Sequence, residues 1–110
     1  MKYCLALDLV DDEQSIADYE SWHKTVWPEI IVSIRESGIE SMEIYRVFNR
    51  LFMIMETNPS FDFEKKKQLD ESNAVVLQWE SMMEKYQQLI PGTPPGSKWV
   101  LMNKVFDLND

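Results

Sequence analysis

The sequence predicts an α+β fold with the element order β-α-β-β-α-β, and three observations carry this prediction. Four segments alternate in side-chain character with a period of two, as strands do. Two regions repeat apolar residues every three or four positions, as helices do. The length of 110 residues and the hydrophobic content of 45% are enough for one core. We therefore expect a single domain that spans residues 1–110.

The first half of the chain predicts a strand followed by helix. Residues 2–10 alternate bulky with small side chains, which indicates a strand. Asp11 or Asp12 then supplies a helix N-cap. Pro28 interrupts the helical pattern, so we expect a break or kink there and a second helical segment that stops at Gly38. The apolar stripe of the first segment consists of Ile16, Tyr19, His23, Val26 and Trp27.

The middle of the chain predicts a hairpin and two further helical segments. Two β-like runs, residues 41–48 and 51–57, are joined by a tight turn at Asn49-Arg50, where asparagine suits the first central position. The charged residues 61–71 then indicate one helix, and residues 73–89, with apolar side chains at helical spacing, indicate another.

The end of the chain predicts a loop and a fourth strand. Residues 91–96 contain three prolines and two glycines, which exclude a helix or a central strand. Residues 98–106 alternate again and indicate a strand. The whole order is that of a ferredoxin-like fold, in which a four-stranded antiparallel sheet carries its helices on one face.

Both faces of this predicted sheet are apolar. In the third strand Leu51, Met53 and Met55 alternate with Phe52 and Ile54. Because the helices cover only one face, a second copy of the same sheet is the simplest cover for the other. We therefore expect a homodimer packed sheet to sheet, a dimeric α/β barrel.

Composition narrows the function classes. The net charge of −8 argues against a general affinity for nucleic acid or anionic membranes, which both bind clustered Lys and Arg. The single Cys4 excludes an intramolecular disulfide, and three scattered glycines exclude the glycine-rich loops of nucleotide-binding enzymes. No apolar run approaches the ~18 residues of a membrane-spanning helix. A soluble cytoplasmic protein is expected.

Tyr19 and His23 are the candidate catalytic residues. They stand four positions apart and therefore share one helix face, a turn apart. An imidazole can give and take a proton near neutrality, because its unperturbed pKa is about 6.5. Spacing alone favours the simpler alternative, a core-edge histidine whose ring nitrogen bonds a backbone carbonyl. His23 is the only histidine, so a histidine-based metal site has no second imidazole and no metal is expected.

The block Tyr19-x-x-x-His23-x-x-x-Trp27-Pro28-Glu29 resembles the first-helix signature of the L-rhamnose mutarotases, small homodimeric α/β-barrel enzymes. The similarity covers nearly the whole chain in the same order and continues through Ile44-Tyr45, Lys85-Tyr86 and the proline-rich loop before Lys98-Trp99-Val100-Leu101. It implies interconversion of the α and β anomers of a free deoxyhexose by acid/base ring opening, without a cofactor. It also implies that His23 is the proton donor and that Tyr19 is a phenol in contact with the sugar.

The chain departs from the family's pattern at two places. The rhamnose enzymes carry two tryptophans directly before the Lys-Tyr of the last helix, where this chain has Met83-Glu84, and a tyrosine where it has Met42. Met83 can still pack on a sugar face, Glu84 can accept hydroxyl hydrogen bonds if it points inward, and Trp79 could supply a replacement ring. The resemblance therefore implies the substrate-binding residues Tyr19, Trp27, Met42, Met83 and Glu84.

Two function hypotheses of different classes follow. The first is a sugar mutarotase that acts on L-rhamnose or a related deoxyhexose such as L-fucose, with His23 as general acid/base and Tyr19 as its partner. The second is a non-catalytic dimeric ferredoxin-like barrel that binds a small ligand or a protein partner, since this fold hosts unrelated functions. A cofactor-independent oxygenase on the same barrel is a third option, to which no specific residue points.

Overall fold

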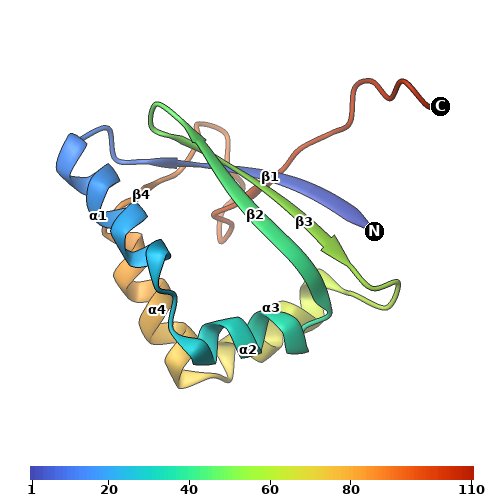
Figure 1. The fold of residues 1–110 in the computed structure, drawn as a ribbon, viewed down its shortest axis with the longest axis horizontal. Helices are drawn as coiled ribbons and strands as arrows, with labels where there is room; N and C mark the ends of the chain where they lie inside the picture. The colour runs from blue at the N-terminus through green and yellow to red at the C-terminus, as the bar shows by residue number, and fades with distance from the viewer.

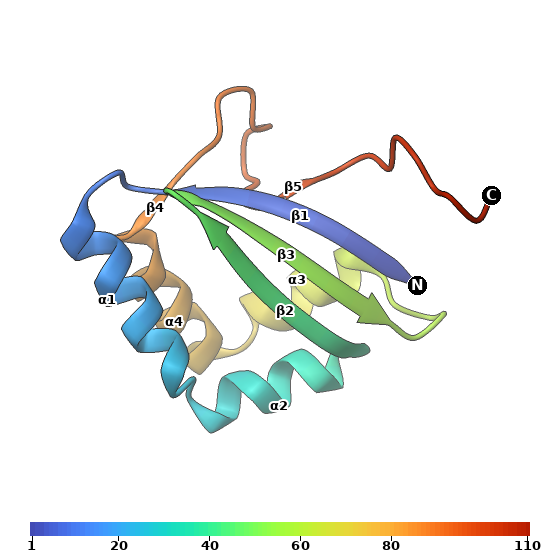
Figure 2. The same ribbon diagram turned by 45° about the horizontal axis from the view of Figure 1, so that its top comes forward.

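The structure, a computed structural model, describes residues 1–110 and consists of an antiparallel sheet with four helices against one of its faces (Figures 1 and 2). In chain order the elements are β1 (Lys2–Leu9), α1 (Glu13–Lys24), α2 (Pro28–Glu36), β2 (Ile39–Val47), β3 (Arg50–Thr57), α3 (Phe63–Glu71), α4 (Ala74–Glu84), β4 (Gln87–Gln88) and β5 (Val100–Leu101). None of the helices combines the length and apolar character that crossing a bilayer requires.

The sheet has five strands rather than the four predicted. Its order is β2-β3-β1-β4, with β5 also pairing with β1, and all pairings are antiparallel. The predicted last strand, residues 98–106, is wrong in extent, because only Val100–Leu101 joins the sheet. The last strand is short because two strands, β4 and β5, pair with different parts of the same edge of β1. Gln87–Gln88 pairs with its far end and Val100–Leu101 with its middle. The sheet of one chain is therefore open and does not close into a barrel.

The predicted helix boundaries are largely confirmed. Asp12 caps α1, and its carboxylate accepts a hydrogen bond of 2.9 Å from the backbone N–H of Ser15. Pro28 breaks the first helical region into two and begins α2. Asn73 caps α4, which ends at Glu84 rather than at residue 89 because the chain turns there into β4.

The hairpin between β2 and β3 turns one residue earlier than predicted. Val47 pairs with Arg50, so Phe48 and Asn49 are the two turn residues. Phe48 adopts a φ of 53°, in the left-handed region that non-glycine residues seldom occupy. The Asn49 side chain donates a hydrogen bond of 3.0 Å to the carbonyl of Leu9, which ties the hairpin to the end of β1.

The core lies between the helices and one face of the sheet, which we call the inner face. The inner face is formed by alternate residues of β1 and β3, and α1, α2 and α4 pack against it. Helix α3 contributes no buried residue. The buried apolar side chains are Leu5, Leu7, Leu9, Tyr19, Ile30, Ile39, Leu51, Met53, Met55, Val76, Trp79 and Met83.

The opposite face of the sheet, the outer face, is not covered by any helix (Figure 2). Cys4 and Ile54 are paired there on β1 and β3 and are half-buried. Beyond β5 the chain runs away from the body of the molecule to the C-terminus (Figure 1), and Val105 and Phe106 in this segment are 96% and 76% exposed.

Candidate functional site

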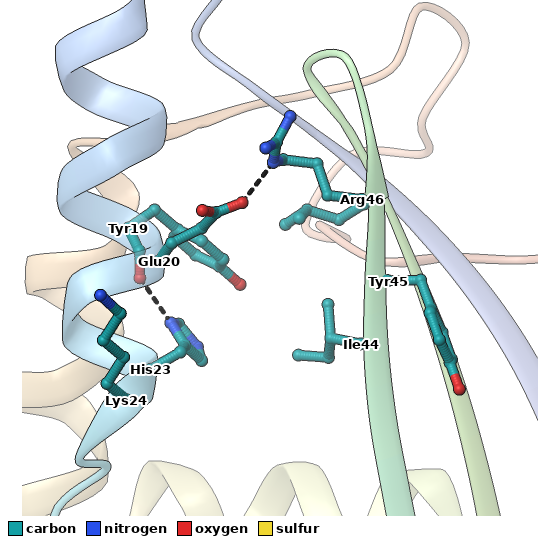
Figure 3. A pocket seen from close by; sticks show the side chains of 8 residues that line it. Tyr19, Glu20, His23, Lys24, Ile44, Tyr45 and Arg46 are labelled. Carbon is teal, nitrogen blue, oxygen red and sulfur yellow. Dashed lines mark hydrogen bonds and ion pairs between the residues drawn. The ribbon is translucent and has the colours of Figure 1, made fainter.

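A cavity of about 270 Å³ opens between α1 and the β2–β3 hairpin (Figure 3). Helix α1 supplies one wall, and the inner face of β2, the edge strand of the sheet, supplies the other. The cavity combines ionisable and apolar side chains. Its lining residues are Tyr19, Glu20, His23, Lys24, Ile44, Tyr45, Arg46 and Leu51.

The structure brings the two predicted catalytic residues together at this cavity. The rings of Tyr19 and His23 lie 4.2 Å apart between centroids, with an angle of 30° between their planes. His23 Nδ1 is 2.8 Å from the backbone carbonyl oxygen of Tyr19. Because a carbonyl oxygen only accepts, the proton of the neutral ring resides on Nδ1. Nε2 makes no hydrogen bond within the chain and is left as a base.

Burial sets the protonation states of this pair. It lowers the pKa of His23 below its ordinary value, and the hydrogen bond to the Tyr19 carbonyl only partly offsets the effect. Burial, reinforced by the Glu80 carboxylate, raises the pKa of Tyr19 far above that of an ordinary phenol. At neutral pH the site therefore holds a neutral imidazole that can accept a proton and a protonated phenol that can donate a hydrogen bond.

One tryptophan contacts the histidine ring, and two further tryptophans pack against that tryptophan. Trp79 of α4 meets the His23 ring edge to face, with centroids 5.5 Å apart, and Trp27 and Trp22 pack against Trp79 at 5.1 and 6.4 Å. Aromatic pairs in this geometry are attractive beyond their buried area. This packing fixes the plane of the imidazole, whereas none of the three indoles lines the cavity.

An ion pair spans the cavity from one wall to the other. Arg46 Nε of β2 donates to the Glu20 carboxylate of α1 (Figure 3). The same guanidinium donates through Nη1 to the carbonyl oxygen of Phe48 at 2.7 Å. The bond between Arg46 and Glu20 is the one side-chain hydrogen bond that joins α1 to β2. The ring of Tyr45, by contrast, points away from the cavity and bonds Glu43 at 2.8 Å (Figure 3).

The sequence reasoning missed the charged residues of the cavity. Glu20 and Lys24 directly follow Tyr19 and His23 on the helix, and Arg46 follows Ile44 by two positions on β2. The period of two in that strand was a usable signal, because it places Ile44 and Arg46 on the same, inward side. An arginine at such a position is unusual in a strand that packs against a core.

The remaining predicted binding residues lie elsewhere. Met83 is buried in the core beside Tyr19 and Trp79. Glu84 is turned to the surface, where it pairs with Lys98 at 2.9 Å. Met42 packs against the core cluster of Leu5, Ile39, Met53 and Met55. Together with Trp27 they stand outside the cavity lining. No group of three or more His, Cys, Asp or Glu side chains is placed to hold a metal ion.

Comparison with known proteins places this chain in a family. The L-rhamnose mutarotase family matches residues 2–108. A protein of Xanthomonas campestris pv. campestris described as an L-fucose mutarotase is 37% identical over 111 residues, covering 99% of this chain and 89% of that one. A UPF0734 protein of Dictyostelium discoideum is 35% identical over 114 residues, covering 97% and 89%.

Solved structures agree in fold. The L-rhamnose mutarotase of Formosa agariphila superposes with a TM-score of 0.71 at 18% identity and 98% coverage of both chains. Tetracenomycin F2 cyclase from Streptomyces glaucescens gives 0.60 at 13% identity, with 97% and 95% covered. A dimeric ferredoxin-like protein from an uncultured marine organism gives 0.53 at 12% identity, with 96% and 90% covered. The match over nearly the whole length and the 37% identical relative show that the chain belongs to the L-rhamnose mutarotase family.

Proposed function

We propose that this protein interconverts the α and β anomers of a free 6-deoxyhexose, L-fucose or L-rhamnose, with His23 as the acid/base group and Tyr19 as its partner. The observation that carries the proposal is the free Nε2 of a neutral imidazole at a cavity that also holds a protonated phenol. The family relationship and the L-fucose mutarotase relative support the substrate class.

The proposed reaction opens and recloses the sugar ring. Nε2 of His23 takes the proton of the anomeric hydroxyl, and the electron pair of that O–H bond becomes the second bond of the aldehyde. The bond between the anomeric carbon and the ring oxygen breaks at the same time. The ring oxygen then receives the proton from the imidazolium, while the Tyr19 phenol donates a hydrogen bond to the developing negative charge.

Rotation about the bond next to the aldehyde and reversal of these steps give the other anomer. His23 ends neutral, so protons and electrons balance over the cycle. These steps use only the protons of the sugar and of the two side chains, and no cofactor is part of the proposal.

Magnetisation-transfer NMR between the two anomeric protons tests the proposal directly. The wild-type protein should speed the exchange of L-fucose or L-rhamnose anomers above the buffer rate. The His23→Gln variant should lose about 10²- to 10⁴-fold of that acceleration, the usual contribution of a positioned acid/base group. Exchange by His23→Gln at the wild-type rate would overturn the assignment. Binding of these sugars without any acceleration would favour the non-catalytic barrel instead.

We also propose that the active form is a homodimer that buries the outer face of the sheet. Apolar side chains occupy this face without a helix over them, and the C-terminal segment carries further exposed apolar residues. A solved structure of similar fold is described as a dimeric ferredoxin-like protein, which is consistent with a dimer. In this assembly the cavities stay on the inner side of each sheet, so each chain keeps its own His23.

A further inference from the structure

The ion pair between Glu20 and Arg46 has no role in the proton transfers proposed above. We propose that it recognises two neighbouring hydroxyl groups on the carbons opposite the anomeric centre, which makes Glu20 and Arg46 the specificity-determining residues of the cavity. This inference rests on the proposed function, because it takes His23 as the group that meets the anomeric hydroxyl.

The position of the pair fits the size of one sugar ring. Glu20 precedes His23 by three residues on α1, which corresponds to a rise of about 4.5 Å along the helix. The Glu20 carboxylate extends from α1 toward Arg46 on β2, and the His23 ring lies one turn further along the helix (Figure 3). A pyranose with its anomeric hydroxyl at Nε2 would therefore present its opposite edge to the pair.

The hydrogen-bonding capacity left in the pair matches a vicinal diol. Only one carboxylate oxygen of Glu20, Oε1, is engaged, and Oε2 makes no hydrogen bond within the chain. Arg46 uses one N–H on Glu20 and one on Phe48, so three of the five guanidinium N–H groups are free. Each hydroxyl of a diol both donates and accepts one hydrogen bond. A carboxylate beside a guanidinium offers both kinds of partner at adjacent points.

The surroundings of the pair favour recognition over a purely structural role. The side chains of Arg46 and Glu20 are 35% and 47% exposed, and ion pairs at such exposure contribute little to stability. Arg46 lies on the same side of β2 as Ile44 and lines the cavity with it. The apolar side chains of Ile44 and Leu51 line the same cavity and suit the methyl group of a 6-deoxyhexose.

The experiment compares anomer exchange of the parent sugar with that of its 3-deoxy and 4-deoxy analogues. The wild-type protein should lose about 10- to 100-fold in kcat/KM when one of the two recognised hydroxyls is removed, as expected for a hydrogen bond to a charged group. Arg46→Met and Glu20→Gln should lose a similar factor with the parent sugar, mainly through KM. These variants should no longer distinguish the parent from the deoxy analogue.

A matched control and a charge swap separate recognition from scaffolding. Lys66→Met removes an ion pair to Asp70 on α3, far from the cavity, and should leave kcat, KM and discrimination unchanged. The double variant Glu20→Arg/Arg46→Glu keeps an ion pair between α1 and β2 but exchanges the donor and acceptor sides. This double variant should recover any thermal stability that the single variants lose. It should not recover the discrimination between the parent sugar and its deoxy analogues. All these variants should keep the wild-type pH profile, since His23 is untouched.

Two outcomes would overturn the inference on its own. One is an Arg46→Met variant that still rejects the deoxy analogues as strongly as the wild-type protein does. The other is a charge swap that restores discrimination, because that result would show that the pair merely holds α1 against β2. A wild-type protein that accelerates no sugar overturns the proposed function instead, and this inference falls with it.

Discussion

Both faces of strand β3 carry apolar side chains, but helices cover only one of the two faces. On β3, the side chains of Leu51, Met53 and Met55 point to the helices and are buried, whereas the alternating Phe52 and Ile54 are half-buried on the outer face. The inner face is packed by α1, α2 and α4, and at the β2 edge it opens into a cavity with charged groups. The alternation of side chains along a strand therefore identifies the two faces of the sheet. Which face forms the candidate site depends on the helices that cover it.

Truncating neighbouring side chains on the two faces is the strongest way to test this difference. Met55→Ala empties a fully packed inner position and should lower the free energy of unfolding by about 2–5 kcal/mol. Ile54→Ala should cost less at low protein concentration, because its side chain is only half-buried in one chain. Urea titrations at two protein concentrations check both values. Equal losses that do not depend on concentration would contradict the distinction between the faces.

A charge on the outer face should separate the copies without unfolding them. Ile54→Asp places a carboxylate in the proposed interface and should raise the dimer dissociation constant at least tenfold, since an unpaired charge is costly to bury. Light scattering after size-exclusion chromatography would then report a halved mass, with an unchanged circular dichroism spectrum. Leu77→Asp, at an exposed position on α4, is the control and should leave the mass unchanged. A wild-type protein that is already monomeric would refute the proposed dimer.

Lowering the pH should reduce the rate of anomer exchange through the protonation of one group, His23. Burial lowers the pKa of His23, so the base form persists to pH values below about 6.5, the pKa of an unperturbed imidazole. The exchange rate should be flat from neutral pH down to that value. Below the pKa of His23 it should fall about tenfold per pH unit, because the protonated ring cannot take the anomeric proton.

The single histidine makes this pH dependence easy to assign. The Cε1 proton of His23 gives one titrating signal in the NMR spectrum, and its midpoint should coincide with that of the acid limb of the rate. Glu20 and Lys24 face the same cavity, so Glu20→Gln serves as the control for a titrating neighbour. A midpoint above 6.5 would contradict the effect of burial. The same sign holds for stability: the histidine favours folding above its unfolded pKa and disfavours it as the pH falls toward the folded one.

The smallest effects are expected for variants of two helix N-caps. Asn73→Ala removes the side chain that accepts from Val75 and Val76 at the start of α4, and it should cost about 1 kcal/mol. Asp62→Ala removes the equivalent bond to Glu64 on α3. It should cost less, because α3 buries no side chain whereas α4 carries Trp79 and Met83 into the core. Thermal unfolding of both variants checks the order, and a larger loss at Asp62 would contradict it.

Local patterns predicted most of the fold. The period of two identified β1, β2 and β3, and caps and prolines located the helix starts. The length of the last strand was overestimated. The alternation of side chains at residues 98–106 does not show whether a neighbouring strand has a free edge for pairing. The two-residue strand Gln87–Gln88 takes part of that edge and has no pattern of its own, so it could not be foreseen.

The site was predictable only where its residues are neighbours on one element. Spacing predicted that Tyr19 and His23 share one helix face, and both line the cavity. The contact of one ring nitrogen with the Tyr19 carbonyl is the one that the simpler alternative predicted, whereas the catalytic role of His23 stays a prediction. Glu20 and Arg46 are 26 positions apart, and their meeting depends on how α1 crosses the edge strand. On α4, Trp79 and Met83 share the inward face, so the next residue, Glu84, is rotated by about 100° toward the surface.

The pairing of Cys4 with Ile54 has a practical consequence. Because the chain holds one cysteine and that thiol lies on the outer face, a single maleimide label marks this face and leaves the inner face chemically untouched. In a sheet-to-sheet dimer the two thiols would come from opposing chains, so their labelling rate would slow as protein concentration rises. The molecule thus carries its own reporter of assembly, independent of any measurement of catalysis.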